Sequence, residues 1–311
     1  MHWDVLGYGL VSVDDLLYVP HYPPPNVKVQ VLRRERQGGG LTGTALVAAA
    51  RLGVRCAFAG VLGDDELSRH AISELEREGV DCTLLMRRAD ARPCHSTIVV
   101  DQSTGSRNIF YTRDGVMARP IAQITPELVA QCRVLFVDSL DLDAALQGTL
   151  IADALGVPVV ADLDFGEYDR ADALLSHVSH LILPEDFALR LTGVRTAPEA
   201  VAALARTQRP CTAVTAGERG AWYAVAGGPV QHQPAFAVPT VDTTGCGDVF
   251  HGAYAACVAR ELSVPESIRF ASATAAIKAM YPGGRAGIPN WAGVEQFLAA
   301  NAAETQKGRT S

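Results

Sequence analysis

Short runs of apolar residues, separated by stretches of helical composition, dominate the second half of the chain. The runs are VLFVD, VPVVAD, HLILP and TAVT, and the stretch between the first two ends near Gly156. Strands that are apolar on both faces are typical of parallel sheets covered by helices on each side. The pattern therefore predicts an α/β fold, a three-layer α/β/α sandwich with a mostly parallel central sheet.

Two other segments have a different pattern. VKVQVLRRER alternates apolar with polar residues, and STIVVDQSTGSRNIFYT resembles two strands around the turn-forming STGS. Both predict a small β-sheet outside the main layer, which we expect to be a lid. NAAETQKGRTS has the composition of a frayed terminus. The predicted division is a core of residues 1–15, 38–93 and 113–300, a lid of residues 16–37 and 94–112, and a flexible tail of residues 301–311.

The composition narrows the range of partners. Of 311 residues 48% are hydrophobic and 20% charged, and the formal net charge of -7 offers no broad basic field, so we expect no nucleic-acid partner. No apolar run reaches the roughly 18 residues that a membrane helix needs, and the N-terminus has no signal-peptide pattern. The seven cysteines form no C-x-x-C pair, which indicates reduced thiols. We therefore expect a cytoplasmic protein with no membrane partner.

The motif with the clearest chemistry is VDTTGCGDVFHGAYAACVARE, residues 241–261. Gly245, Cys246 and Gly247 form a small-residue turn, and apolar residues then recur at helical spacing, so Asp248 is expected at a helix N-terminus. Backbone N–H groups there attract an anion, and a carboxylate beside them accepts a proton from an attacking hydroxyl. An ordinary helix cap fits the short G-x-G-D pattern as well. On this short pattern alone, helix capping and phosphoryl transfer both stay open.

Three further segments are rich in glycine, which allows a ligand to approach the backbone closely. Residues 37–53 place glycines before an Ala-rich helix, and residues 214–225, VTAGERGAWYAV, are typical of strand, turn and strand. Residues 271–289 combine a small-residue helix with a Gly-rich loop. Helix packing and a plain hairpin explain the first two segments equally well. Near the N-terminus, GLVSVDDLLYV places Asp14 after a strand. Gly7 and Gly9 could be taken for the first two glycines of a dinucleotide-binding fingerprint, but Ser12 stands where the third glycine is needed, which argues against that motif.

The string D-T-x-G-x-G-D followed by an apolar helix resembles the second signature of the ribokinase/PfkB carbohydrate-kinase family, and the resemblance runs from about residue 4 to residue 298. It implies a ribokinase-like fold and ATP-dependent phosphorylation of a sugar hydroxyl with Mg²⁺, and as a hypothesis K⁺. By this resemblance Asp248 is the catalytic base, and the amides of Gly245, Cys246 and Gly247 form an anion hole. It assigns substrate binding to Asp14, Gly39, Gly40 and Thr44, nucleotide binding to Thr215, Gly217, Gly220, Ala276 and Gly283 and, as a hypothesis, a monovalent cation to Asp242 and Thr244. The family's N-x-x-E element is altered in this chain, with Pro184 and Phe187 at its Asn and Glu places, so Glu185 is the nearby acid expected to help with Mg²⁺, indirectly.

Other resemblances concern the substrate. The C-terminal third is similar to bacterial sulfofructose kinases, and Lys28 falls where those enzymes have a lysine that meets the sulfonate. Two of their other anion contacts are replaced in this chain, near Phe110 and at Ser139, and Thr44 stands where the family usually has a sugar-binding Asn. GSRNIFYTRD resembles the lid strand of ketohexokinases, where an arginine like Arg107 reaches the active site. We therefore expect a ketose, such as fructose or 6-deoxy-6-sulfofructose, phosphorylated at a primary hydroxyl.

Three alternatives stay open. A kinase for tagatose or fructose phosphates needs extra basic residues, for which Lys28, Arg107 and Arg113 are candidates. A nucleoside kinase needs an aromatic base pocket, which lid aromatics such as Phe110 and Tyr111 could supply. A sugar-binding regulator without activity has the same fold, although Asp248 and its turn argue for catalysis. The resemblance also implies a homodimer formed through the lid, because exposed strand edges pair with partners.

Overall fold

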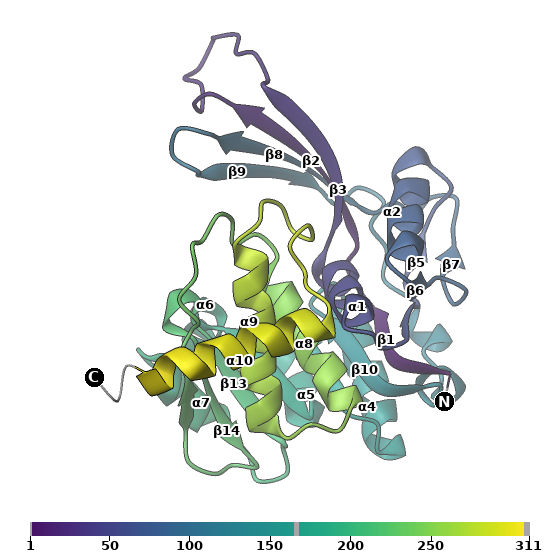
Figure 1. Ribbon diagram of the computed structural model, residues 1–311. Coiled ribbons are helices and arrows are strands. Elements are labelled where there is room, and N and C mark those ends of the chain that lie inside the picture. Colours follow the sequence, from purple (N-terminus) through teal and green to yellow (C-terminus); the bar gives the residue numbers. More distant parts are fainter. Residues whose placement is uncertain (1, 165–167, 308–311) are drawn as a thin grey trace.

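A nine-stranded sheet lies at the centre of the computed structural model, which describes residues 2–164 and 168–307 (Figure 1). The strand order is β15-β14-β13-β12-β11-β10-β1-β4-β6, and all pairs are parallel except those that β14 makes with β13 and β15. The strands are β1 Trp3–Tyr8, β4 Cys56–Phe58, β6 Val80–Asp81, β10 Cys132–Asp138, β11 Val159–Asp162, β12 His180–Pro184, β13 Cys211–Thr215, β14 Ala221–Val225 and β15 Gln231–Gln233. The apolar runs of the sequence are therefore the buried parallel strands that their pattern predicts.

Helices cover both faces of this sheet, and each face has its own apolar core. One face carries α1 Leu41–Arg51, α2 Glu66–Arg77, α8 Cys246–Ala259, α9 Val264–Ala279 and α10 Trp291–Lys307. The other carries α3 Pro126–Val129, α4 Leu142–Leu155, α5 Tyr168–His177, α6 Glu185–Thr192 and α7 Ala197–Leu204. Helix α4 ends at Gly156, whose φ of 68° is the left-handed conformation that glycine supplies at helix ends. The predicted three-layer sandwich is confirmed.

The chain order of the strands reverses between β1 and β10. From β1 the sheet grows through β4 to β6 on one side, and from β10 through β11 and β12 on the other. Ligands in open α/β sheets bind at such a switch point, beyond the carboxyl ends of the strands. The Nε2 atom of His251 on α8 lies 3.0 Å from the carbonyl oxygen of Ile182 on β12. The turn that starts α8 therefore faces the edge formed by the carboxyl ends of the strands.

A second, four-stranded sheet has the order β3-β2-β8-β9 and stands out from one end of the core (Figure 1). Its strands are β2 Ser12–Val19, β3 Arg33–Gly39, β8 Cys94–Asp101 and β9 Arg107–Thr112, and a two-stranded ladder of β5 Val61–Leu62 and β7 Met86–Arg87 lies in the core. Leu16 and Tyr18 on β2 and Ile98 on β8 form a small, separate apolar cluster. We refer to the four strands as the lid.

The structure differs from the sequence predictions at three places. Asp14 lies on strand β2 rather than after a strand, because the β2–β3 ladder begins with Ser12 opposite Gly39. The alternating residues 27–31 form no strand, and β3 begins only at Arg33, after the loop that contains three successive prolines. Helix α10 continues to Lys307, so residues 301–307 belong to a helix and not to the irregular tail that their composition predicts; residues 308–311 lie outside the described part.

The cysteines agree with the prediction of reduced thiols. All seven cysteines are free thiols, and five of them are buried. In the described part of the chain, no helix is long and apolar enough to cross a membrane.

Candidate active site

Helix α8 begins at Cys246 after Gly245, and Asp248 lies in its first turn. Gly245 has a φ of 70°, and a Cβ there would lie 2.9 Å from the carbonyl oxygen of Gly284, so the turn requires glycine. Nothing lies within 4 Å of the place a Cβ of Gly247 would take, which leaves the helix N-terminus open above it. The Cys246 amide donates within the turn to the Thr243 carbonyl oxygen at 3.2 Å. The opening is suited to an anion, because the helix dipole and free amides point there.

Asp248 belongs to a group of carboxylates at the ends of the central strands. Burial raises its pKa well above the ordinary value, and the negative charge of Asp162 at the end of β11 adds to this effect. His251 and Arg285 act in the opposite direction. A carboxylate with a raised pKa binds a proton more tightly, which is the property that a general base needs.

His251 fixes α8 to this group. Its Nδ1 lies 2.9 Å from the Gly247 carbonyl oxygen and 3.2 Å from Asp162 Oδ2, while Nε2 lies 3.0 Å from the Ile182 carbonyl oxygen. Burial lowers the pKa of His251 and raises that of Asp162. Because the ring is held on both sides, the first turn of α8 has a fixed position relative to β11 and β12.

The predicted sugar-binding residues come together where the lid joins the core. The carboxylate of Asp14 on β2 accepts from Ser12 Oγ at 3.1 Å. Burial raises its pKa, and the hydroxyls of Ser96 and Ser12 lower it. Gly39 lies against this carboxylate, since a Cβ there would be 2.2 Å from Asp14 Oδ2. Gly40, with a φ of 85°, starts helix α1, on which Thr44 is buried.

Arg285 lies between the sugar-binding residues and the carboxylate Asp248, although no sequence motif pointed to it. Its Nη2 donates to the Gly39 carbonyl oxygen at 2.8 Å, and its Nε donates to Thr44 Oγ1 at 3.2 Å. The side chain also interacts electrostatically with Asp14 and Asp248. The residue lies in the segment 271–289 that predicted nucleotide contacts, but it faces the sugar-binding residues.

Asp242 connects the loop before α8 with the loop after α9. Its Oδ1 accepts from the Thr244 amide at 2.8 Å and from Thr244 Oγ1 at 2.7 Å, and its Oδ2 accepts from the Gly283 amide at 2.8 Å. The buried Lys278 donates to its carbonyl oxygen at 2.9 Å. Arg107 Nη1, from lid strand β9, lies 3.7 Å from Asp242 Oδ1. The structure thus brings the predicted lid arginine to the start of α8.

The predicted nucleotide residues Thr215, Gly217 and Gly220 lie at the end of β13 and in the 3-10 turn before β14. Gly220 has a φ of 85°, and a Cβ there would be 2.1 Å from the Gln233 carbonyl oxygen. Glu185, at the start of α6, forms an ion pair with Arg219 in this turn. Ala276 lies on α9. Glu185 is therefore next to the nucleotide residues, with its carboxylate engaged by an arginine.

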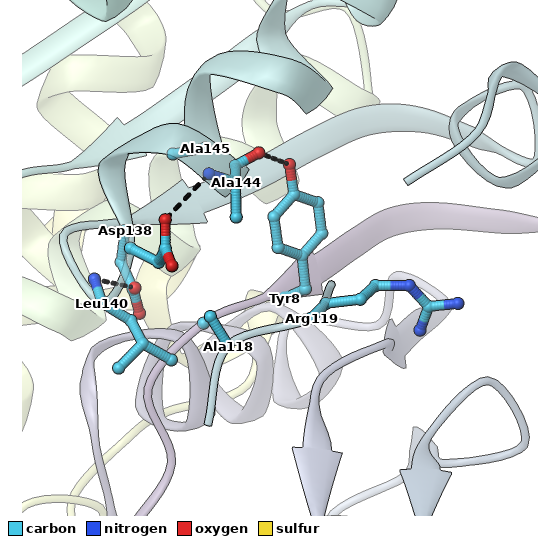
Figure 2. Close-up of a pocket in the computed structure, with 9 residues that line it drawn as sticks. Tyr8, Ala118, Arg119, Asp138, Leu140, Ala144 and Ala145 are labelled. Atoms are coloured by element: carbon cyan, nitrogen blue, oxygen red, sulfur yellow. Dashed lines mark hydrogen bonds between the residues drawn. The ribbon is translucent and has the colours of Figure 1, made fainter. Parts of the chain in front are cut away.

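The carboxylate of Asp138, at the end of β10, has a supporting role. It accepts from the amide and hydroxyl of Thr42 at 3.2 and 2.7 Å, from the Leu10 amide at 2.7 Å and from the Leu140 amide at 2.9 Å. Figure 2 shows Asp138 beside a small cavity into which the ring of Tyr8 points. The Tyr8 hydroxyl donates to the Ala144 carbonyl oxygen. Because the Asp138 carboxylate accepts four hydrogen bonds, it fixes the backbone around Leu10, Thr42 and Leu140 and is not available as a base.

Other residues discussed for the substrate lie in the lid or beside Asp164. Lys28 is exposed in the loop at the far end of the lid, and within the described residues it makes no ion pair (Figure 1). Phe110 and Tyr111 are exposed on strand β9. Ser139, where sulfofructose kinases have an arginine, donates to Asp164 at 2.9 Å. The described residues contain no cluster of three or more His, Cys, Asp or Glu that could hold a metal ion.

An open helix N-terminus, a carboxylate with a raised pKa in its first turn and glycines close to Asp14 are features expected of a phosphotransferase that acts on a hydroxyl group. The family model of the pfkB family carbohydrate kinases matches residues 4–291, and the chain belongs to this family. It is an ATP-dependent sugar kinase.

Known proteins agree with this assignment. The chain is 27% identical over 299 residues to the ribokinase of Haemophilus influenzae, covering 93% of this chain and 96% of the relative. It is 26% identical over 280 residues to the ketohexokinase of Mus musculus, covering 86% and 92%. A crystal structure from Agrobacterium tumefaciens matches with a TM-score of 0.88 and 29% identity over 97% of this chain and 99% of that chain. Arabidopsis thaliana ribokinase complexed with ribose and ATP, at 21% identity and a TM-score of 0.80 over 96% and 99%, has the same fold.

Proposed function

We propose that the protein transfers the γ-phosphoryl group of ATP to a primary hydroxyl of a ketose, with fructose or 6-deoxy-6-sulfofructose as the leading substrates. The observation that carries the proposal is the position of Arg107. Nη1 of this lid residue lies 3.7 Å from Oδ1 of Asp242, in the loop before α8, and the resemblance of its strand to ketohexokinases implies that an arginine here reaches the active site. Fructokinase-1 of Oryza sativa, at 29% identity, and mouse ketohexokinase are among the relatives.

The residues suit a single in-line transfer. Asp14 accepts hydrogen bonds from sugar hydroxyls and orients the ring, while Asp248 accepts the proton of the attacking hydroxyl. As the hydroxyl oxygen bonds to the γ-phosphorus, the bond from this phosphorus to the β–γ bridging oxygen breaks, and ADP leaves. The turn amides of Gly245 and Gly247 stabilise the negative charge on the moving phosphoryl group, while the Cys246 amide donates to the Thr243 carbonyl oxygen. Thr215, Gly217, Gly220, Ala276 and Gly283 contact the nucleotide.

The cofactor proposals follow from the same residues. Mg²⁺ neutralises charge on the phosphates when bound, and few protein ligands are needed because Mg²⁺ binds mainly through substrate phosphates and water. Glu185 affects it only indirectly, since its carboxylate is paired with Arg219. Asp242 and Thr244 are proposed to hold K⁺, although both carboxylate oxygens of Asp242 already accept hydrogen bonds.

The experiment is an assay of ADP formation with fructose, 6-deoxy-6-sulfofructose, ribose, tagatose 6-phosphate and adenosine. We expect the highest kcat/KM with a ketose, no activity without Mg²⁺, and a lower rate without K⁺. Preference for tagatose 6-phosphate or adenosine would overturn the ketose proposal. No turnover with any compound, combined with binding of a sugar, would identify a regulator instead. A rate unchanged without K⁺ would remove the cation role of Asp242 and Thr244.

We also propose a homodimer formed through the lid. All six residues of the edge strand β9 are exposed, and Phe110 and Tyr111 retain 54% and 67% of their surface. An exposed edge with apolar side chains favours strand pairing with a second copy. The expected mass in solution is therefore twice 33.0 kDa, and Phe110→Asp is expected to shift it toward the monomer. A wild-type monomer by light scattering would contradict the proposal.

A further inference from the structure

Arg285 is a buried cation beside the predicted sugar-binding residues. It retains only 6% of its accessible surface. Its guanidinium is packed against two glycines: a Cβ at Gly38 would lie 2.2 Å from Nη1, and a Cβ at Gly43 would lie 2.8 Å from Nη2. Larger residues at either position would exclude the guanidinium. The chain thus has a space shaped for this side chain, between lid strand β3 and helix α1.

The guanidinium has no carboxylate ion pair among the described residues. Its hydrogen bonds go to two neutral oxygens, the Gly39 carbonyl and Thr44 Oγ1. A guanidinium carries five N–H donors, so these two bonds leave donors for a further partner. Burying a charge without a counter-ion is costly unless hydrogen bonds compensate it. Four carboxylates interact with it electrostatically, and in order of decreasing effect they are Asp14, Glu74, Glu78 and Asp248.

A hydrogen bond from Arg51 fixes the backbone of Arg285. Arg51 Nη1 donates to the Arg285 carbonyl oxygen at 2.7 Å, and Arg51 is itself paired with Glu78 at 2.7 Å. The Arg51–Glu78 pair therefore fixes the backbone position from which the Arg285 side chain reaches Thr44. Thr44 is shorter than the Asn that usually occupies this place, and the guanidinium occupies space next to its hydroxyl.

We propose that Arg285 is a specificity-determining residue of the sugar site, whose guanidinium donates hydrogen bonds to hydroxyl oxygens of the substrate while Asp14 accepts hydrogen bonds from the same polyol edge. The inference rests on the proposed function, since it requires a sugar in this pocket. Arg285 supplies donors where the carboxamide of an asparagine is missing, and neighbouring carboxylates balance its charge. The ligand class is a neutral polyol edge with adjacent hydroxyl groups.

The test compares Arg285→Met and Arg285→Lys with the wild type, with fructose and its singly deoxygenated analogues as probes. Hydrogen bonds to a charged donor are stronger than neutral ones. We therefore expect Arg285→Met to raise the KM for fructose at least about 10-fold, with the KM for ATP changed less than about twofold, and Arg285→Lys to recover part of the loss. The wild type should also discriminate against one deoxy analogue, and Arg285→Met should lose that discrimination.

A matched control separates binding from packing. Arg209 is also a buried arginine, which donates to the carbonyl oxygens of Val178, Leu204 and Leu175. Arg209→Met should lower Tm without changing either KM. If Arg285→Met behaves in the same way, or keeps the discrimination between fructose and its analogues, the inference is wrong while the kinase function stands. If the wild type turns over no sugar, the proposed function fails and the inference fails with it.

Discussion

Asp248→Asn is expected to lower kcat for sugar phosphorylation by about 10²- to 10⁴-fold. The amide has the same shape as the carboxylate but does not accept the hydroxyl proton. ATP and sugar should bind with nearly unchanged Kd, because the open amides of the α8 turn and the residues around Asp14 are unaltered. Tm at neutral pH should stay the same or rise, since the change removes a buried charge next to Asp162.

The pH dependence of the wild type tests the same assignment. Asp248 acts as a base only when ionised, and its pKa is raised well above the ordinary value by burial and by Asp162. As the pH falls through this raised pKa, the carboxylate is protonated and kcat/KM should decline. The residual rate of Asp248→Asn should lack this acidic limb.

The control for Asp248→Asn is Glu261→Gln, just beyond the other end of α8. The Glu261 side chain is 80% exposed and pairs with Arg133. Its loss should leave kcat within about twofold, because an exposed ion pair contributes little. Equal activity of Asp248→Asn and Glu261→Gln would contradict the role of Asp248.

Gly252→Val is expected to have the largest effect on stability. Gly252 lies where helices α8 and α1 touch, and a Cβ there would be 2.1 Å from the backbone carbonyl oxygen of Ala45. The helices must separate to admit a side chain, because a backbone atom cannot rotate away. Overpacking of this kind costs about 1–3 kcal/mol or more. Urea unfolding should therefore show a lower midpoint, and kcat should also fall, since both helices begin at the site.

A glycine next to a side chain instead of a backbone atom provides the comparison. Gly293 lies in α10, and the nearest atom to a Cβ there is Asn290 Oδ1 at 3.2 Å, the end of a side chain. Gly293→Ala should leave the unfolding midpoint unchanged or slightly higher, because alanine favours a helix over glycine. If Gly252→Val and Gly293→Ala unfold at the same urea concentration, the close contact of α8 with α1 is not a constraint.

Local patterns predicted much of the fold. The apolar runs from VLFVD to TAVT became β10 to β13, because such runs can only be buried between two layers of helices. The turn at Gly245 and the apolar spacing after Asp248 predicted the start of α8 for an equally local reason. By contrast, the alternation of residues 27–31 did not produce a strand, since alternation alone cannot supply a partner to pair with.

Long-range contacts could not be predicted in the same way. Arg285 contacts Thr44 and Gly39, which lie 241 and 246 residues away in the sequence. No periodic pattern connects such distant positions. The available signal was indirect: glycines at positions 38 and 43 and a threonine in place of an asparagine leave room that a long side chain can fill. For Lys28, the motif position predicted a substrate contact, but the loop places it in the exposed far part of the lid.

The most direct test of the central claim is phosphorus-31 NMR of the wild-type protein with ATP, Mg²⁺ and fructose, or whichever ketose gives the highest turnover. We predict that the γ-phosphate resonance of ATP is replaced by that of a phosphomonoester, split into a triplet by the two protons of a primary carbon, only when both sugar and enzyme are present. Formation of inorganic phosphate alone, or unchanged ATP with every sugar, would contradict the account.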